Sequence, residues 1–228
     1  MADKTEEEFR AMKGELSGDI YIGGGETDAM NQVAAVCREL QEEHPGIRYH
    51  FFSGNAQDVT ERLDKGLLDF GLLIQPTDIA KYDYLSLPAK DSWGVILRRD
   101  SPLAAKAAIR ADDLAGVPLI FSRQVLEERA ESNELVKWFG SLWEELNIVT
   151  TFNLCYNAAV MAKQGVGCVV SLDKLVDTSE DSPLCFLPLD PPLESGLDVV
   201  WKKYQVFSAA AELFLKRLRE RCAENLVC

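Results

Sequence analysis

The fold is decided by the stretch Gly18-Asp-Ile-Tyr-Ile-Gly-Gly-Gly-Glu-Thr-Asp28, which predicts a buried strand, a glycine turn and the start of a helix. Ile20 and Ile22 alternate with polar neighbours, as on a strand, and the glycines after them let the backbone turn tightly. Thr27 or Asp28 would cap the helix that follows. A helix that begins at the end of a strand presents unpaired N–H groups and its positive dipole end, which suits a small anion. The apolar face expected for this helix is Met30, Val33, Ala34, Cys37 and Leu40.

The composition of the 228 residues is that of a folded, acidic protein. Apolar residues make up 47% and charged residues 27%, which is ordinary for a globular chain. The formal net charge of -13 repels phosphate backbones, so we do not expect this chain to bind nucleic acid by itself. Because no run of about 18 apolar residues exists, no membrane-spanning helix is predicted. The acidic, polar beginning of the chain predicts no secretory signal.

The cysteines are scattered, and only two histidines, His44 and His50, accompany them. Without C-x-x-C spacing we predict neither a metal site nor a bound cofactor. Buried, reduced thiols in a cytoplasmic protein are the expected state. The six cysteines are Cys37, Cys155, Cys168, Cys185, Cys222 and Cys228.

Strands and helices alternate in the first third of the chain. After the first strand and helix, strands are expected at 48–53 and 68–74, with a short helix between them that Gly66 ends. Such alternation implies parallel pairing with right-handed crossovers. The strand ends then share one edge of the sheet, where ligands of such folds bind. The residues expected at that edge are Gly24 to Thr27, Gly54, Asn55 and Gln75.

The rest of the chain repeats this pattern and then returns. Residues 77–92 are interpreted as a crossing segment, followed by a strand at 93–98. The later strands are expected at 118–121, 148–152, 167–171, 184–189 and 197–203, and the helices at 133–146, at 157–164 and after Ser208. We therefore predict an α/β fold of two Rossmann-like lobes with a hinge of two crossing strands and a cleft between the lobes.

Several pieces of the chain, in this order, resemble the effector-binding domain of LysR-type transcriptional regulators. The most telling is Leu63-Asp-Lys-Gly-Leu-Leu-Asp-Phe-Gly-Leu72, which is similar to the family's L-x-x-G-x-L-D-x-G run. The other pieces are Gly14-Glu-Leu-Ser-Gly-Asp-Ile-Tyr-Ile-Gly23, His44-Pro-Gly-Ile47, Asp100-Ser-Pro-Leu-Ala104, Asp113-Leu-Ala-Gly-Val-Pro-Leu-Ile120 and Val160-Met-Ala-Lys-Gln-Gly-Val-Gly167. The resemblance implies the fold of type 2 periplasmic binding proteins and a cytoplasmic, ligand-sensing role without catalysis.

The resemblance also implies partners. Family members carry an N-terminal winged helix-turn-helix and a long dimerising helix, and this chain shows neither. DNA contact is then expected only through that absent domain, under the control of a small, anionic effector, and no membrane is involved. A homodimer is expected, or a tetramer in the full-length protein, with the helices at 27–43 and 56–65 as candidate contacts.

The resemblance sets the expected domain boundaries. Residues 1–13 are interpreted as the end of the linker helix or a cloning remnant, because so short a polar segment has no core of its own. The first lobe is expected at 14–90 plus 190–228, and the second at 91–189.

The ligand-binding residues of the first lobe are expected at its strand ends. If the family carries over, Thr27 contacts the effector through its hydroxyl, with Gly25 beside it; a plain helix cap without a ligand is the alternative. Asn55 either reaches the cleft or is a turn residue that tolerates positive φ. Gln75 either donates to a ligand or is an exposed polar residue of a loop.

The second lobe is expected to contribute two pairs of residues. Ser122 and Arg123 follow a buried strand, and an arginine fork can hold a carboxylate by two hydrogen bonds; a surface arginine is the alternative. Tyr156 and Asn157 open a helix and are expected to close over a ligand, although Tyr156 equally suits packing. The tryptophans are expected in the core or at an interface.

Two departures from the family pattern stand out. Ser171 occupies a place where the family often has proline. Glu26 precedes Thr27 in a turn where the family often has serine or threonine directly. An acidic side chain there would repel an anionic effector unless it points away.

No catalytic residues are predicted. The sequence has no G-x-S-x-G, no H-E-x-x-H and no P-loop, and the pair Asp112-Asp113 is expected to be solvated in a turn. Two other interpretations stay open: a solute-binding protein of a transporter, and an enzyme on a related two-lobed fold. An export signal upstream would favour the first, and a reactive cysteine or a perturbed acid in the cleft would favour the second.

Overall fold

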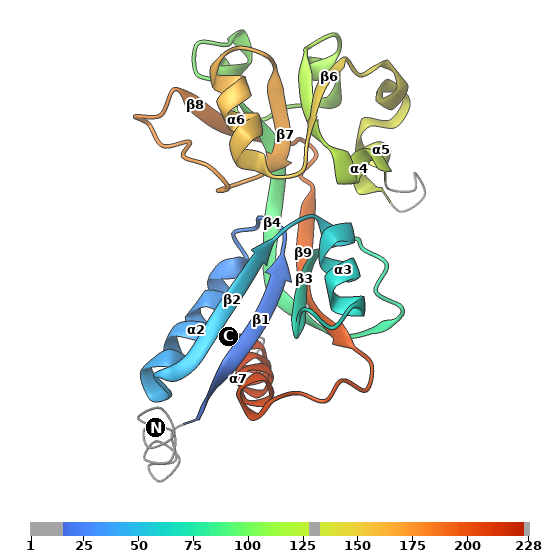
Figure 1. The fold of residues 1–228 in the computed structure, drawn as a ribbon. Coiled ribbons are helices and arrows are strands. Elements are labelled where there is room, and N and C mark those ends of the chain that lie inside the picture. The colour runs from blue at the N-terminus through green and yellow to red at the C-terminus, as the bar shows by residue number, and fades with distance from the viewer. Residues whose placement is uncertain (1–15, 128–132, 226–228) are drawn as a thin grey trace.

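The protein folds into two α/β lobes joined by two strands (Figure 1). A computed structural model describes residues 16–127 and 133–225, so the expectation for residues 1–13 lies outside the described residues. We call the half that holds the first three strands lobe I and the other half lobe II. The predicted fold class is confirmed.

Lobe I starts with strands and helices in strict alternation. Its first elements are β1 (Ser17–Gly24), α2 (Met30–Glu43), β2 (Gly46–Ser53), α3 (Ala56–Asp64) and β3 (Phe70–Ile74). Strand β1 pairs with β2 on one side and with β3 on the other, and both pairings are parallel. The parallel arrangement that the alternation predicts is therefore present.

The buried face of α2 differs from the expected one at a single position. Val33, Val36 and Leu40 are buried, whereas Ala34 is exposed. Steps of three and four residues from Val33 lead to Val36 and Leu40, so Val36 takes the core position on this face. The expectation for Ala34 is wrong.

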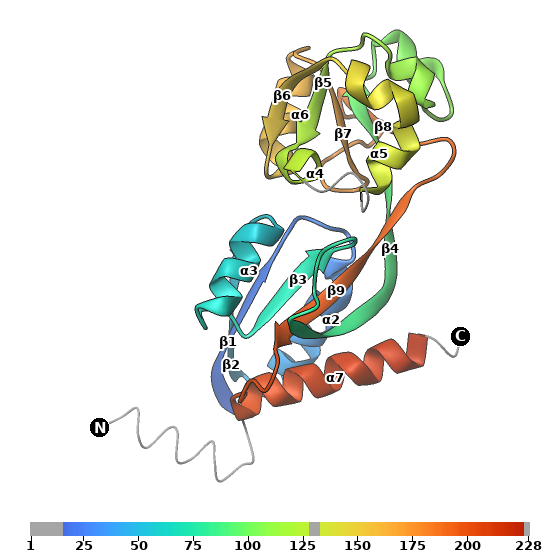
Figure 2. The same cartoon turned by 90° about the vertical axis from the view of Figure 1, so that its right-hand side faces the viewer.

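Two long strands, β4 (Tyr82–Arg98) and β9 (Glu194–Lys202), run from one lobe to the other (Figure 2). In lobe I they pair with each other, antiparallel, and β9 also pairs with β3. The predicted crossing segment and the separate strand at 93–98 are thus one strand of 17 residues. Pro88, which lacks an N–H, lies in an irregularity of this pairing that spares it from the ladder. The lobe boundary at residue 90 stays a prediction, since β4 passes through it unbroken.

Lobe II has its own set of strands, which the upper part of β4 joins. Its elements are β5 (Leu119–Ser122), α4 (Arg123–Glu127), α5 (Glu134–Phe139), β6 (Ile148–Phe152), α6 (Cys155–Lys163), β7 (Cys168–Leu172) and β8 (Leu184–Pro188). Strands β6 and β7 run parallel to β5, and β7 and β8 flank the upper part of β4. The predicted helix at 133–146 ends early, because Gly140 has a φ of +56° that glycine adopts readily and that breaks an α-helix.

Each lobe packs its own hydrophobic core. In lobe I, Phe70 lies among Phe207, Phe214 and Trp201, under the last helix α7 (Ala209–Asn225). In lobe II, the rings of Phe121, Phe139 and Trp143 pack together, and Trp93 and Trp138 lie against the same core. Separate cores allow the lobes to move as units about β4 and β9.

Candidate functional site

The strand ends of lobe I meet at the edge that faces lobe II (Figure 1). The Gly54 N–H donates to the Gly24 carbonyl over 3.0 Å, which holds the ends of β1 and β2 together. Gly25 lies against the end of β3, since a Cβ at this position would come within 3.3 Å of Ile74 Cδ1. The backbone of the first turn therefore lies at the border of the space between the lobes.

Thr27 is tied to the crossing strand and not free to meet a ligand in this arrangement. Its side chain is 8% exposed, and its hydroxyl donates to the carboxylate of Asp91 on β4. The same hydroxyl accepts the Ala29 N–H over 3.1 Å, next to the start of α2. The structure therefore places Thr27 as a local cap and as a link between the first turn and the hinge.

Replacing Asp91 by asparagine is expected to change how stability depends on pH. Burial raises the pKa of Asp91, against the hydrogen bond from Thr27, and the charge of Asp28 raises it further. Between about pH 3.9 and its raised pKa, Asp91 therefore keeps a proton in the folded state that it has released in the unfolded state. Its contribution to the free energy of unfolding falls with rising pH across this interval and is constant above it. In urea unfolding from about pH 4 to about pH 8, the free energy of unfolding should therefore fall more steeply in the wild type than in the Asp91→Asn variant. Parallel curves for the Asp91→Asn variant and the wild type would contradict it.

Gln75 reaches from the end of β3 to the second crossing strand. Its Nε2 donates to Asp198 Oδ1 over 2.8 Å, and the Ser86 hydroxyl donates to the same oxygen over 2.6 Å. The Gln75 N–H donates to the Gly196 carbonyl over 2.9 Å. These contacts hold Gln75 at the base of the hinge, and its side chain is not that of a free loop residue.

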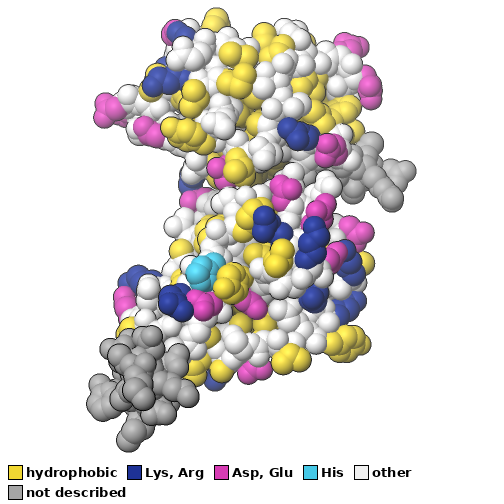
Figure 3. All heavy atoms as spheres, viewed as in Figure 1, with side chains coloured by type: hydrophobic (Ala, Val, Ile, Leu, Met, Phe, Trp, Pro, Cys, Tyr) yellow, Lys and Arg dark blue, Asp and Glu magenta, His cyan; other side chains and the backbone are white. Residues whose placement is uncertain are grey.

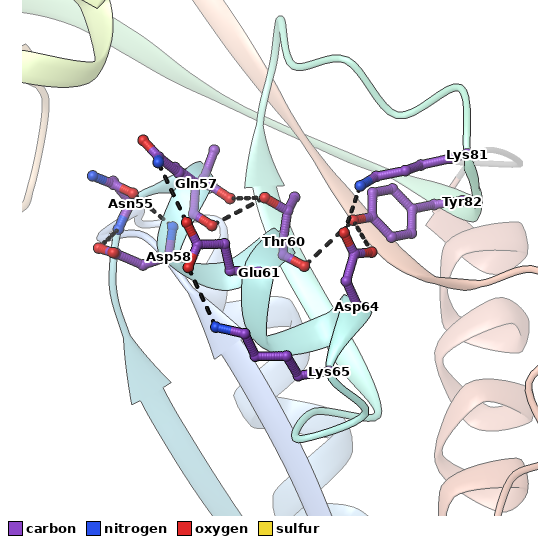
Figure 4. Close-up of polar contacts among 10 residues, drawn as sticks. Asn55, Gln57, Asp58, Thr60, Glu61, Asp64, Lys65, Lys81 and Tyr82 are labelled. Carbon is purple, nitrogen blue, oxygen red and sulfur yellow. Dashed lines mark hydrogen bonds and ion pairs between the residues drawn. The ribbon is translucent and has the colours of Figure 1, made fainter.

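Asn55 begins helix α3 and does not reach across the space between the lobes. Its Oδ1 accepts the Asp58 N–H over 2.9 Å, and Asp58 Oδ2 accepts the Asn55 N–H over 3.4 Å (Figure 4). Its φ is −73°, so the interpretation as a residue with positive φ is wrong. At the other end of α3, Asp64 accepts hydrogen bonds from Lys81 and Tyr82, which fixes the helix to the chain that leads into β4 (Figure 4).

An Asn55→Ala substitution is expected to lower the free energy of unfolding by about 0.5–2 kcal/mol, because it removes the capping box of α3. No contact between the lobes should change, since the side chain is engaged by its own helix. Chemical denaturation measures the loss, and Gln57→Ala on the exposed side of α3 is the matched control. An equal loss in the two variants would argue against a capping role.

Lobe II presents Ser122 and the residues after it toward lobe I. Arg123 is exposed and is not among the described residues that line the pocket between the lobes. Gln124, which the sequence did not single out, accepts the Ala56 N–H of lobe I over 3.0 Å through its Oε1. The only sequence signal for Gln124 is its place just after a strand end, the same signal that pointed to Arg123.

The start of α6 faces the first turn of lobe I. Tyr156 is 69% exposed and Asn157 is also exposed, and neither lines the pocket between the lobes. The group that meets lobe I is instead the Cys155 N–H, which donates to the carboxylate of Glu26. Glu26 therefore points across the space between the lobes and not away from it.

The Cys155 thiol is buried beside the hydroxyl of Ser171. Ser171 Oγ lies 3.3 Å from Cys155 Sγ. Burial raises the pKa of the Cys155 thiol to about 11, so the thiol stays protonated near neutral pH and is a poor nucleophile. The arrangement gives no support to thiol chemistry at this position.

One pocket of about 80 Å³ lies between the lobes. Gln75 and Ser195 line it from lobe I and the crossing strand. The polar lining from lobe II is Ser122, Gln124, Asn133 and Glu134, and the apolar walls come from Ile74, Pro76, Trp93, Val125, Leu135 and Leu172. Typical ligand pockets hold about 300–1,000 Å³, so a small molecule of ordinary size could enter only after the lobes or side chains move. Lys, Arg, Asp and Glu side chains lie on both lobes next to the narrow region that joins them (Figure 3).

Within residues 16–127 and 133–225, no three His, Cys, Asp or Glu side chains come together in a way that could hold a metal ion. None of the described helices is both long enough and apolar enough to span a membrane. The five cysteines in the described part of the chain are free thiols.

The sequence matches a known family over most of its length. The model of the LysR substrate binding domain matches residues 13–223. The HTH-type transcriptional regulator YvbU of Bacillus subtilis, itself uncharacterized, is 26% identical over 220 residues, which are 96% of this chain and 72% of that regulator.

Two solved structures share the fold. The regulatory domain of CcmR from Synechocystis, in complex with 2-PG, has a TM-score of 0.74 at 19% identity and covers 90% of this chain and 98% of its own. The effector-binding domain of QuiR, in complex with shikimate, has a TM-score of 0.71 at 18% identity and covers 92% of this chain and 99% of its own. At such identities the likeness concerns the fold alone.

Proposed function

The chain belongs to the family of LysR substrate-binding domains, and from that premise we propose that it senses a small molecule for a LysR-type transcriptional regulator. The effector, expected to be an anion, binds between the lobes. Its preference for one arrangement of the lobes then controls DNA binding by a helix-turn-helix domain of the full-length protein. CcmR and QuiR, which share the fold, are solved with small molecules bound, and this supports a comparable role here.

The observation that carries the proposal is the pocket to which both lobes contribute polar side chains. Gln75 comes from lobe I and Ser122 from lobe II, and both are held by regular structure at strand ends. A ligand that contacts both residues makes all of its contacts in only one arrangement of the lobes, and its binding therefore stabilises that arrangement. Gly25, Arg123 and Tyr156 are proposed as further contacts once the lobes rearrange.

The proposed assembly is a cytoplasmic homodimer, or a tetramer in the full-length protein. Helices α2 and α3 are the proposed contact surfaces, because both present an exposed polar face beside a buried one. DNA would be contacted only through the helix-turn-helix domain, which agrees with the net charge of -13 on this chain.

Thermal unfolding of the domain against a panel of small anions, with 2-PG and shikimate among the first compounds, tests the proposal. A true effector at a hundred times its Kd should raise the free energy of unfolding by about 2.7 kcal/mol. Calorimetric titration should then give one site per chain. If no compound of a broad metabolite panel binds, the sensing role is wrong.

A further inference from the structure

Helix α6 of lobe II lacks a cap of its own. Its N-cap residue is Leu154, whose apolar side chain accepts no hydrogen bond. The first N–H groups of a helix have no partner within the helix and need one from elsewhere. The carboxylate of Glu26, from the first turn of lobe I, accepts the Cys155 N–H and so supplies the cap from the other lobe.

Two more contacts tie the same regions together. Lys174, just after β7, lies 2.9 Å from the carboxylate of Asp28. The Ala56 N–H at the start of α3 donates to Gln124 of lobe II over 3.0 Å. The lobe I residues of all three contacts lie just after the ends of β1 and β2, on the side that faces lobe II. The contacts therefore oppose separation of the lobes.

The Glu26 contact is the strongest candidate among the three to hold the lobes. Cys155 is buried and Glu26 is half-buried, so solvent screens the carboxylate only in part, and the positive end of the α6 dipole also favours its charge. In the pair of Lys174 and Asp28 the side chains are 65% and 34% exposed, and ion pairs open to solvent are weak and salt-sensitive. Gln124 offers only a neutral hydrogen bond.

We propose that Glu26 is a latch between the lobes: without effector, its carboxylate caps α6 and holds the cleft in the arrangement described above. The neighbouring Thr27 is anchored to Asp91 of the crossing strand, so movement of Glu26 is transmitted to the hinge. The role of the latch in sensing rests on the proposed function, whereas the contact itself forms without a ligand. An effector admitted between the lobes opens or replaces this contact, and removal of the latch lowers the cost of that step.

Hydrogen exchange and small-angle scattering of the unliganded domain test the latch without knowledge of the effector. Three variants are compared with the wild type: Glu26→Ala, Glu26→Gln, and Glu144→Ala, which removes one exposed negative charge in lobe II as a control. In Glu26→Ala the Cys155 amide should exchange about tenfold faster or more, and the radius of gyration should increase. Glu26→Gln keeps an acceptor without the charge and should lie between, while Glu144→Ala should match the wild type.

Two results would overturn the latch. One is unchanged exchange at Cys155 in Glu26→Ala. The other is faster exchange with an unchanged radius of gyration, which would make Glu26 a local cap that does not hold the lobes. A panel in which no small molecule binds, together with the expected exchange and scattering, would reject the proposed function and leave the latch in place.

Discussion

A Ser122→Trp substitution is expected to abolish effector binding while the fold persists. Ser122 ends β5 and lines the pocket of about 80 Å³ between the lobes. An indole ring, which buries about 150–250 Å² when packed, would fill this space and prevent the two lobes from meeting around a ligand. The stabilisation of about 2.7 kcal/mol expected at a hundredfold excess of effector over Kd should vanish from thermal unfolding.

The matched control for this variant is Ser141→Trp, an exposed serine of the same lobe that does not line the pocket. It should bind the effector as the wild type does. If Ser122→Trp keeps the full effector-dependent stabilisation, the effector binds elsewhere and the pocket has no part in sensing.

The largest loss of stability is expected from Phe70→Ala. The ring of Phe70 is fully buried and lies 4.9 Å from the ring of Phe207 and 5.1 Å from that of Phe214, centroid to centroid. Removing it should lower the free energy of unfolding by about 3–5 kcal/mol, through lost burial and the cavity left behind. Urea unfolding followed by tryptophan fluorescence measures this loss, because the ring of Trp201 packs against Phe70.

Phe51→Ala is the control for Phe70→Ala, because the side chain of Phe51 is 46% exposed on β2, the edge strand of the same lobe. Its loss should be within about 1 kcal/mol. Similar losses in the two variants would mean that the aromatic cluster under α7 does not dominate the stability of lobe I.

Much of the fold could be predicted from the sequence, because local patterns dictate it. The alternation of apolar strands with amphipathic helices predicts the parallel pairing that β1 makes with β2 and with β3. Ser208 was expected to cap the last helix, and its hydroxyl accepts the Ala211 N–H over 3.2 Å. The unbroken run of β4 was missed, because periodicity changes where a strand passes from one sheet to another, and Pro88 at the irregularity resembles a break.

The candidate site was less predictable, because its contacts depend on how the lobes meet. Gln75 and Ser122 were expected from their strand ends, and both line the pocket. Thr27 was expected at a ligand, but its hydroxyl is held by Asp91, which lies 64 residues away in the chain. No local signal connects Glu26 with the Cys155 N–H, since that contact joins residues of different lobes.

The central claim is that one small molecule is bound by both lobes at once. An amide chemical-shift titration of the isotope-labelled domain, with the compound that the thermal panel identifies, tests it most directly. The account predicts saturable shifts at Gln75 in lobe I and at Ser122 and Gln124 in lobe II, all with a single Kd. Shifts confined to one lobe, or centred on a surface away from these residues, would contradict it.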